Sequence, residues 1–393
     1  MSESIKALSS SSKTVSRLER LEKYLLQDPQ NPALLADACE AAIASGRHDR
    51  ARAHLDRAEA LGLDRNEWDF RRARLCIAAR ELDQARQLLE GLRTGGVDHP
   101  AVAHDLAYMH FLQGELESCR IILHPWLSKA ADTSADDLDA LQALWLRATH
   151  RLHHMEEAWG WIEQQQAAGT LQATASGVAS LVGVDTSHFE AARQLAERAL
   201  ATDPEQPEAL VARATVAMAE DSNEAAQQLL QRALQAHPED GRIWSALAFA
   251  SLQAGDLSQA AMQFEHALAS SMREHVGTWH GLGWTRLLQG DRPGALAAFS
   301  HALDLDRNFA ESHGAVGLLL GLQGNGEQAQ HHLRVADKLN PDNVTGRFAR
   351  AVLAGEAANP AQIRNLAAQI FQRPGFLEGS LSDSVSQALA RRR

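Results

Sequence analysis

The sequence predicts an all-α protein built as a solenoid of repeated helical hairpins. Three observations point to this class. Aromatic residues make up only 5% of the chain, and alanine, leucine, glutamine and arginine are abundant while β-branched residues are sparse, a composition typical of helices. The length of 393 residues exceeds one usual globular domain and favours several domains or a repeat array. A repeating register along most of the chain then favours the array.

The register is clearest at the small residue that opens the second helix of each expected hairpin. Six of the eight intervals between these anchor residues are 34 residues long and one is 35. The anchors are Ala51, Ala85, Cys119, Ala158, Ala192, Ala226, Ala260, Ala295 and Ala329. The remaining interval, from Cys119 to Ala158, is 39 residues long, and we assign its extra length to a polar loop over residues 129–137.

Other columns of residues keep the same phase. Nearly all residues twelve positions before an anchor are small, and most residues four positions after it are bulky and apolar. Five positions before the anchor a glycine recurs, at Gly46, Gly114, Gly255, Gly290 and Gly324. Small residues let paired helices approach closely, and glycine permits the left-handed backbone of a tight bend. Because one hairpin cannot bury its apolar face alone, neighbouring hairpins are expected to stack.

These spacings resemble the tetratricopeptide repeat (TPR), a 34-residue helical hairpin with small residues at its 8th, 20th and 27th places and a closing proline. The segments beginning at Gly241 and Val276 match the family pattern well. The matching residues of the first segment are Trp244, Leu247, Ala248, Gly255, Ala260, Phe264 and Ala267. The resemblance implies a right-handed superhelical solenoid of about nine repeats with capping helices.

The quality of the repeats divides the chain into five stretches. We expect a disordered serine-rich tail over residues 1–13, and a capping helix followed by repeats over 14–130. Degenerate repeats then occupy 131–206, and well-matched repeats occupy 207–343. The last stretch, 344–393, should hold a further first helix from about Val344, capping helices near 361–372 and 382–391, and a tail.

Charge and targeting signals exclude several classes of protein. The net charge of −12 argues against a nucleic-acid partner, which needs clustered Lys and Arg. The N-terminus lacks the pattern of a Sec-type signal peptide, and no run approaches 18 apolar residues, so we expect a cytoplasmic protein without membrane insertion. An address for a signal-peptide-independent secretion system remains an alternative for the serine-rich start. Few lysines and many Ala, Arg and Gln residues indicate a bacterial origin.

Enzymatic readings find little support. The chain has no Gly-rich phosphate loop, GxSxG elbow or HExxH motif, so we predict no catalytic residues, no cofactor and no metal site. Only about 50 residues follow Asn343, too few for the transferase domain that follows some TPR arrays. Cys39, Cys76 and Cys119 fall at packing places of the repeat and form no CxxC, which favours core filling in a reducing compartment.

The stretch THRLHHMEE, residues 149–157, gathers three histidines and two carboxylates. His153 occupies the slot of the bend glycine, His150 ends the first helix and His154 lies in the bend. We therefore interpret the stretch as a hairpin bend that has lost its glycine, not as a metal site. A contact of His153 with Glu157 remains open, and it would favour the protonated imidazole. The His331–His332 pair is expected on the surface of a second helix.

In TPR proteins the first helices line a concave groove through places 2, 5, 9 and 12 of each repeat. Carried onto this sequence, these places predict ten partner-binding residues: Tyr108, Met218, Arg242, Phe249, Leu252, His280, Trp284, Leu287, Leu318 and Phe348. An apolar stripe on an open face is typical of partner sites. The alternative is that tight winding, or the C-terminal helices, bury the stripe. The Lys, Asn and Arg set of a chaperone-type carboxylate clamp is missing, with Ala246, Gly281 and Ala315 at place 6.

Together these features predict a non-enzymatic scaffold or adaptor that binds a protein or peptide partner in the groove, in assembly, secretion or envelope biogenesis. The alternative is a dedicated chaperone-like or regulatory subunit of a single enzyme or secretion substrate. The sequence leaves the partner's identity and the oligomeric state open.

Overall fold

The computed structural model describes residues 17–129 and 133–355, in which the regular secondary structure is helical. The tail expected over 1–13 and the helices expected near 361–372 and 382–391 lie outside these residues. The chain divides into two compact bodies. Unit 1 comprises residues 1–186 and 201–203, and unit 2 comprises residues 187–200 and 204–393.

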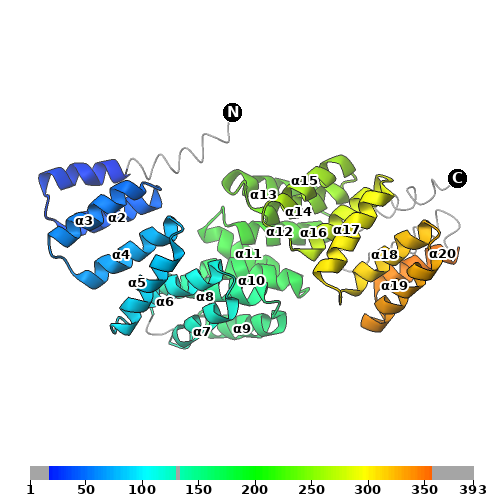
Figure 1. Cartoon of the computed structure of the whole chain (residues 1–393), viewed down its shortest axis with the longest axis horizontal. Helices are drawn as coiled ribbons and strands as arrows, with labels where there is room; N and C mark the ends of the chain where they lie inside the picture. The colour runs from blue at the N-terminus through cyan, green and yellow to red at the C-terminus, as the bar shows by residue number, and fades with distance from the viewer. Residues whose placement is uncertain (1–16, 130–132, 356–393) are drawn as a thin grey trace. The chain divides into compact units, whose positions relative to one another are not determined.

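Unit 1 begins with a lone helix over residues 17–27, whose Leu18, Leu21 and Leu25 pack into one core with Leu35 and Leu55. Helical hairpins follow it (Figure 1). Their helices are α2 (Pro32–Ala44), α3 (His48–Ala60), α4 (Arg65–Ala78), α5 (Leu82–Thr94), α6 (Pro100–Leu112), α7 (Leu116–Leu127), α8 (Ala135–Arg151), α9 (Met155–Ala168) and α10 (Ala173–Asp185). The first helices α2, α4, α6 and α8 each contact the next one along the series.

Unit 2 continues the pattern from α11 (Phe189–Thr202). Its further helices are α12 (Pro207–Ala219), α13 (Asn223–Ala236), α14 (Gly241–Gln253), α15 (Leu257–Ala269), α16 (Val276–Leu288), α17 (Arg292–Leu305), α18 (Ala310–Leu322), α19 (Gly326–Leu339) and α20 (Val344–Leu353). The first helix expected from about Val344 is α20. Each first helix from α12 to α18 packs against its own second helix, and each second helix from α13 to α19 packs against the next hairpin. Direct contacts between first helices also join α12 to α14, α14 to α16 and α18 to α20. The predicted all-α solenoid is confirmed, while its right-handed sense stays a prediction.

The anchor residues explain why the hairpins close. Each anchor lies in a second helix, and each is at most 1% exposed. The bulky residue one helical turn later is also buried, with Phe264 and Phe299 fully enclosed in the core of unit 2. A small residue at the crossing lets the two helices approach, and the bulky one fills the space beside it.

The bends carry a backbone signature that extends beyond the glycines. In the described residues, all nine positions that lie five residues before an anchor have positive φ. Five are the glycines of the repeat pattern, and four are L-residues in the same left-handed conformation: Arg80, His153, Ser187 and Asp221. At His153 φ is 59°. A residue with a side chain pays roughly 1 kcal/mol for this conformation, so the repeat keeps its bend even where the glycine is absent.

The long interval before Ala158 is only partly a loop. Helix α8 begins at Ala135 and has 17 residues, against 13 in α6. The expectation of a loop reaching residue 137 is therefore wrong at its end, because the extra residues lengthen the helix. Ser134 caps α8 by accepting a hydrogen bond from the backbone N–H of Asp137 at 3.2 Å. Asp136 and Asp137 add negative charge to the first turn, which favours helix formation there.

Candidate partner-binding face

The ten predicted partner-binding residues fall into different environments. Arg242 is exposed, and Tyr108, Met218 and Phe249 are half-buried. The other six are between 0 and 4% exposed, and we call them the unit 2 stripe: Leu252, His280, Trp284, Leu287, Leu318 and Phe348. These six side chains belong to the interior of unit 2 and present no open surface. Five of them share one hydrophobic cluster, His280 being the polar exception.

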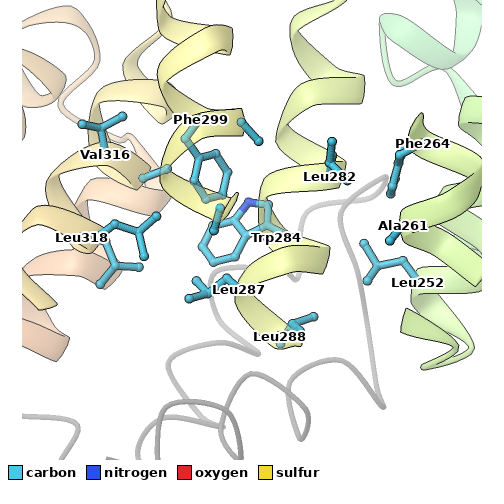
Figure 2. Packing of buried hydrophobic residues seen from close by; sticks show 14 of the residues in the cluster. Leu252, Ala261, Phe264, Leu282, Trp284, Leu287, Leu288, Phe299, Val316 and Leu318 are labelled. Carbon is cyan, nitrogen blue, oxygen red and sulfur yellow. The ribbon is translucent and has the colours of Figure 1, made fainter. Parts of the chain in front are cut away.

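Trp284 illustrates this environment. Its ring meets the edge of Phe299 with ring centroids 5.4 Å apart. Figure 2 shows the indole beside Phe299 and Leu287, with Leu318 on the adjacent helix. An aromatic side chain packed on several sides contributes mainly to stability. A partner could reach it only after part of the core had opened.

Glycines on the first helices account for this close packing. A Cβ added to Gly314 of α18 would lie 2.5 Å from the backbone nitrogen of Gly346 in α20, so the two backbones are already in contact. A Cβ added to Gly281 would lie 2.3 Å from Phe264 Cζ and 3.0 Å from Phe249 Cζ. The space that a side chain would need is filled by the neighbouring helix, which buries the residues around it.

Neutral polar contacts link the same helices. His280 Nε2 lies 2.8 Å from Ser312 Oγ, joining α16 to α18, and Ser245 Oγ lies 2.9 Å from Thr278 Oγ1, joining α14 to α16. Burial lowers the pKa of His280 to about 4, because a charged imidazole would lose its hydration there. His280 is thus a neutral structural group in the interior of unit 2.

The equivalent places in unit 1 give a different surface. On α2, α4 and α6 the side chains at places 5, 9 and 12 include aromatic, aliphatic and charged groups, and they are half-buried or exposed. We call this surface the unit 1 face. It consists of Ile43, Phe70, Arg74, Ile77, His104, Tyr108 and Phe111.

Ring contacts order the α6 part of the unit 1 face. His104, Tyr108 and Phe111 are spaced four and three residues apart, so they share one side of the helix. The centroids of His104 and Tyr108 are 6.3 Å apart and those of Tyr108 and Phe111 are 6.5 Å apart, with nearly parallel rings. The guanidinium of Arg151 lies over Phe111 at 5.0 Å. These half-buried rings form a preorganised apolar row that still meets solvent.

Ion pairs hold the α2–α4–α6 part of the unit 1 face. Glu40 on α2 receives Arg74 at 2.9 Å and Arg71 at 3.6 Å from α4, and Arg74 also faces Asp105 of α6 at 3.7 Å. The two carboxylates therefore already have cationic partners within the fold. Arg74 remains nearly half exposed, and it lies over Phe70 at 5.9 Å.

The groove places of the third repeat predicted His104, Tyr108 and Phe111 of this surface from the sequence, with Tyr108 chosen among the ten partner-binding residues. Phe70, Arg74 and Ile77 were omitted. The signal for them was present, because the same places 5, 9 and 12 counted from the second repeat give these three residues. Arg151 was not detectable in that way. It follows the groove places of its repeat in sequence and joins the face only through its contact with Phe111.

The histidine-rich stretch at residues 149–157 forms the bend between α8 and α9. His150 Nε2 lies 2.6 Å from the Asp185 carboxylate. His154 Nδ1 lies 3.3 Å from Glu157, whose carboxylate also pairs with Arg120. Glu157 thus meets His154 and Arg120 in place of His153, the partner that the sequence left open.

Over the described part of the chain, no group of three or more His, Cys, Asp or Glu side chains has a geometry that could hold a metal ion. Across the same residues, none of the helices combines the length and hydropathy that crossing a membrane requires.

Comparisons with known proteins agree with the fold. A family model for the tetratricopeptide repeat matches residues 18–69, 185–248 and 217–272. No curated protein sequence matches the chain. Among solved structures, a monomeric IFIT1 mutant with m7Gppp-AAAA has 14% sequence identity and a TM-score of 0.56, and the match covers 96% of this chain and 95% of that one.

Two further structures match parts of the chain. PilF of Pseudomonas aeruginosa has 19% identity and a TM-score of 0.42, covering 55% of this chain and 96% of its own. YrrB, described as a TPR protein with an unusual peptide-binding site, has 18% identity and a TM-score of 0.35, covering 46% and 92%. Such low identities show similarity of fold alone. The repeat matches along the sequence, together with the all-α solenoid architecture, identify the chain as a tetratricopeptide-repeat protein.

Proposed function

We propose that the chain is a non-enzymatic protein-interaction scaffold that binds a protein or peptide segment on the unit 1 face. The observation that carries this proposal is the row of half-buried rings on α6, bordered by Arg151, with Arg74 over Phe70 on the neighbouring α4. Aromatic side chains and arginine are the residue types most enriched at binding hot spots. Because the rings are already stacked on one another, little side-chain entropy is lost when a partner covers them.

We assign partner binding to the unit 1 face and no longer to most of the ten residues predicted from the sequence. Six of those residues support the interior of unit 2, so their replacement is expected to alter folding first. Met218, Phe249 and Arg242 are accessible and form a secondary candidate surface within unit 2. Roles in assembly, secretion or envelope biogenesis, a bacterial origin and a cytoplasmic location remain predictions. The acidic net charge continues to argue against a nucleic-acid partner.

Affinity capture from the host extract tests the proposal. Immobilised full-length chain is compared with Tyr108→Ala, which removes a half-buried ring, and with Ile121→Ala as the matched control. Ile121 is apolar and 70% exposed but lies on the second helix α7. We expect Tyr108→Ala to lose captured protein while Ile121→Ala and the helical content are unchanged. Equal capture by all three proteins would contradict the proposal.

The same capture experiment separates the scaffold from its alternative. Several unrelated partners, each lost with Tyr108→Ala, support a scaffold or adaptor. A single stoichiometric partner supports a dedicated chaperone-like or regulatory subunit. Quantitative mass spectrometry of the bound fraction distinguishes the two outcomes.

A further inference from the structure

The chemistry of the unit 1 face restricts the segment that can bind there. We infer that the bound segment is an extended, acidic-apolar peptide, in which a carboxylate two residues from an apolar side chain pairs with Arg151 while the apolar side chain packs on Tyr108 and Phe111. This inference rests on the proposed function and specifies its partner.

The apolar half of the inference follows from the ring row. Tyr108 and Phe111 are half-buried, and their nearly parallel planes present one continuous apolar strip. Covering such a strip removes apolar surface from water, which favours binding. A segment without a bulky apolar side chain would leave the surface of these two rings exposed to water.

The charged half follows from how the arginines near the rings are neutralised. Arg71 and Arg74 share Glu40, and Arg74 also faces Asp105. Arg151 is exposed and its guanidinium lies over Phe111. Within residues 17–129 and 133–355, no carboxylate lies within 4.0 Å of this guanidinium, so it forms no ion pair there. It therefore remains the cation beside the rings that an incoming carboxylate can pair with. A basic segment would meet Arg151 with like charge and would find Glu40 and Asp105 already paired.

The spacing follows from the distance between the two parts of the site. The Arg151 guanidinium carbon lies 5.0 Å from the centre of the Phe111 ring. Side chains on the same side of an extended peptide are two residues apart, roughly 6.5 Å along the chain. Adjacent residues point to opposite sides. One two-residue step from an apolar side chain on Tyr108, beside the Phe111 ring that the guanidinium covers, thus brings a carboxylate within reach of Arg151.

The experiment is a positional peptide scan against the full-length chain. The probes are labelled 11-residue peptides of Ser and Gly with one central Leu or Phe, into which a single Glu is placed at each other position in turn. A matched series carries Lys in place of Glu. Binding is measured by fluorescence anisotropy at low and high salt for the natural chain, for Arg151→Ala and for Arg93→Ala. Arg93 is exposed on α5 and controls for the loss of one positive charge.

We expect Glu two residues from the apolar side chain to bind best, roughly fivefold more tightly than the Lys peptide, as for an exposed ion pair of about 1 kcal/mol. The preference should vanish in Arg151→Ala, persist in Arg93→Ala and weaken at high salt. Equal binding of the Glu and Lys series, a preference for Lys, or binding of neither series would overturn the inference. Capture of host protein through Tyr108 would still stand in those cases, so failure of the inference is distinguishable from failure of the proposed function.

Discussion

Helices α4 and α6 of unit 1 and helices α16 and α18 of unit 2 use the same register but treat the first-helix face in opposite ways. At place 6, α4 and α6 have the charged residues Arg71 and Asp105, where α16 and α18 have Gly281 and Ala315. Charged side chains must reach water or one another, and at this place they form the ion pairs that border an accessible row of rings. Small residues let helices meet, and the large side chains beside them become core. The change from large charged residues to small residues at place 6 thus accompanies the change from an accessible surface to a buried core.

Histidines reflect the same contrast. In unit 1 several histidines lie beside carboxylates, as in His110–Glu115 and His150–Asp185. In unit 2 the buried His280 meets the hydroxyl of Ser312. Three predictions exploit these differences, beginning with the largest expected effect.

Acid should destabilise unit 2 through His280. Its pKa is about 4 in the fold against an ordinary value of 6.5, so the fold favours the neutral imidazole. The resulting stabilisation is fully present above about pH 6.5 and is lost as the pH falls toward 4, by roughly 3 kcal/mol in total. Urea unfolding at pH 7 and pH 4.5 measures the loss, and His280→Gln is the non-titrating reference. A drop of equal size in both proteins would show that His280 is not responsible.

Glycine replacements should have opposite signs in the two units. Gly314→Ala places a Cβ against the backbone of Gly346 and should cost about 1–3 kcal/mol. Gly160→Ala, in α9 of unit 1, has open space around the new Cβ and should stabilise by about 0.5–1 kcal/mol. Thermal and urea unfolding report both values. Tolerance of Gly314→Ala would mean that α18 and α20 are not in backbone contact.

The smallest effect is expected at the bends. His153→Gly should stabilise unit 1 by up to about 1 kcal/mol, because glycine adopts positive φ without the steric cost of a Cβ. Gly114→Ala, at φ 79°, should destabilise by a similar amount. Midpoints of thermal unfolding measure both changes. Destabilisation by His153→Gly would indicate that the imidazole makes a contact that offsets its strain.

The repeat register was sufficient to predict the hairpins, their anchors and the position of each bend, because helix pairing depends on local spacing and small residues. It also located the bend at His153, where only the phase and no glycine marks the turn. Exposure of the first-helix face was not predictable in the same way. It depends on how closely successive repeats approach, and the sequence-based prediction gave Leu318 and Tyr108 equal standing although Gly314 beside Leu318 already indicated close packing. The length of α8 was missed because a polar stretch at a helix start resembles a loop.

The central claim, an accessible face on unit 1 and a buried stripe in unit 2, is tested most directly by thiol labelling under native conditions. The natural thiols give little background, since Cys39, Cys76 and Cys119 are buried and burial raises their pKa values to about 12, 11 and 12. A maleimide is reacted separately with Tyr108→Cys and Leu318→Cys. We expect the thiol at 108 to react within about tenfold of a free peptide thiol, and the thiol at 318 to react at least about a hundredfold more slowly, because it must await opening of the core. Equal labelling rates at the two positions would contradict the account.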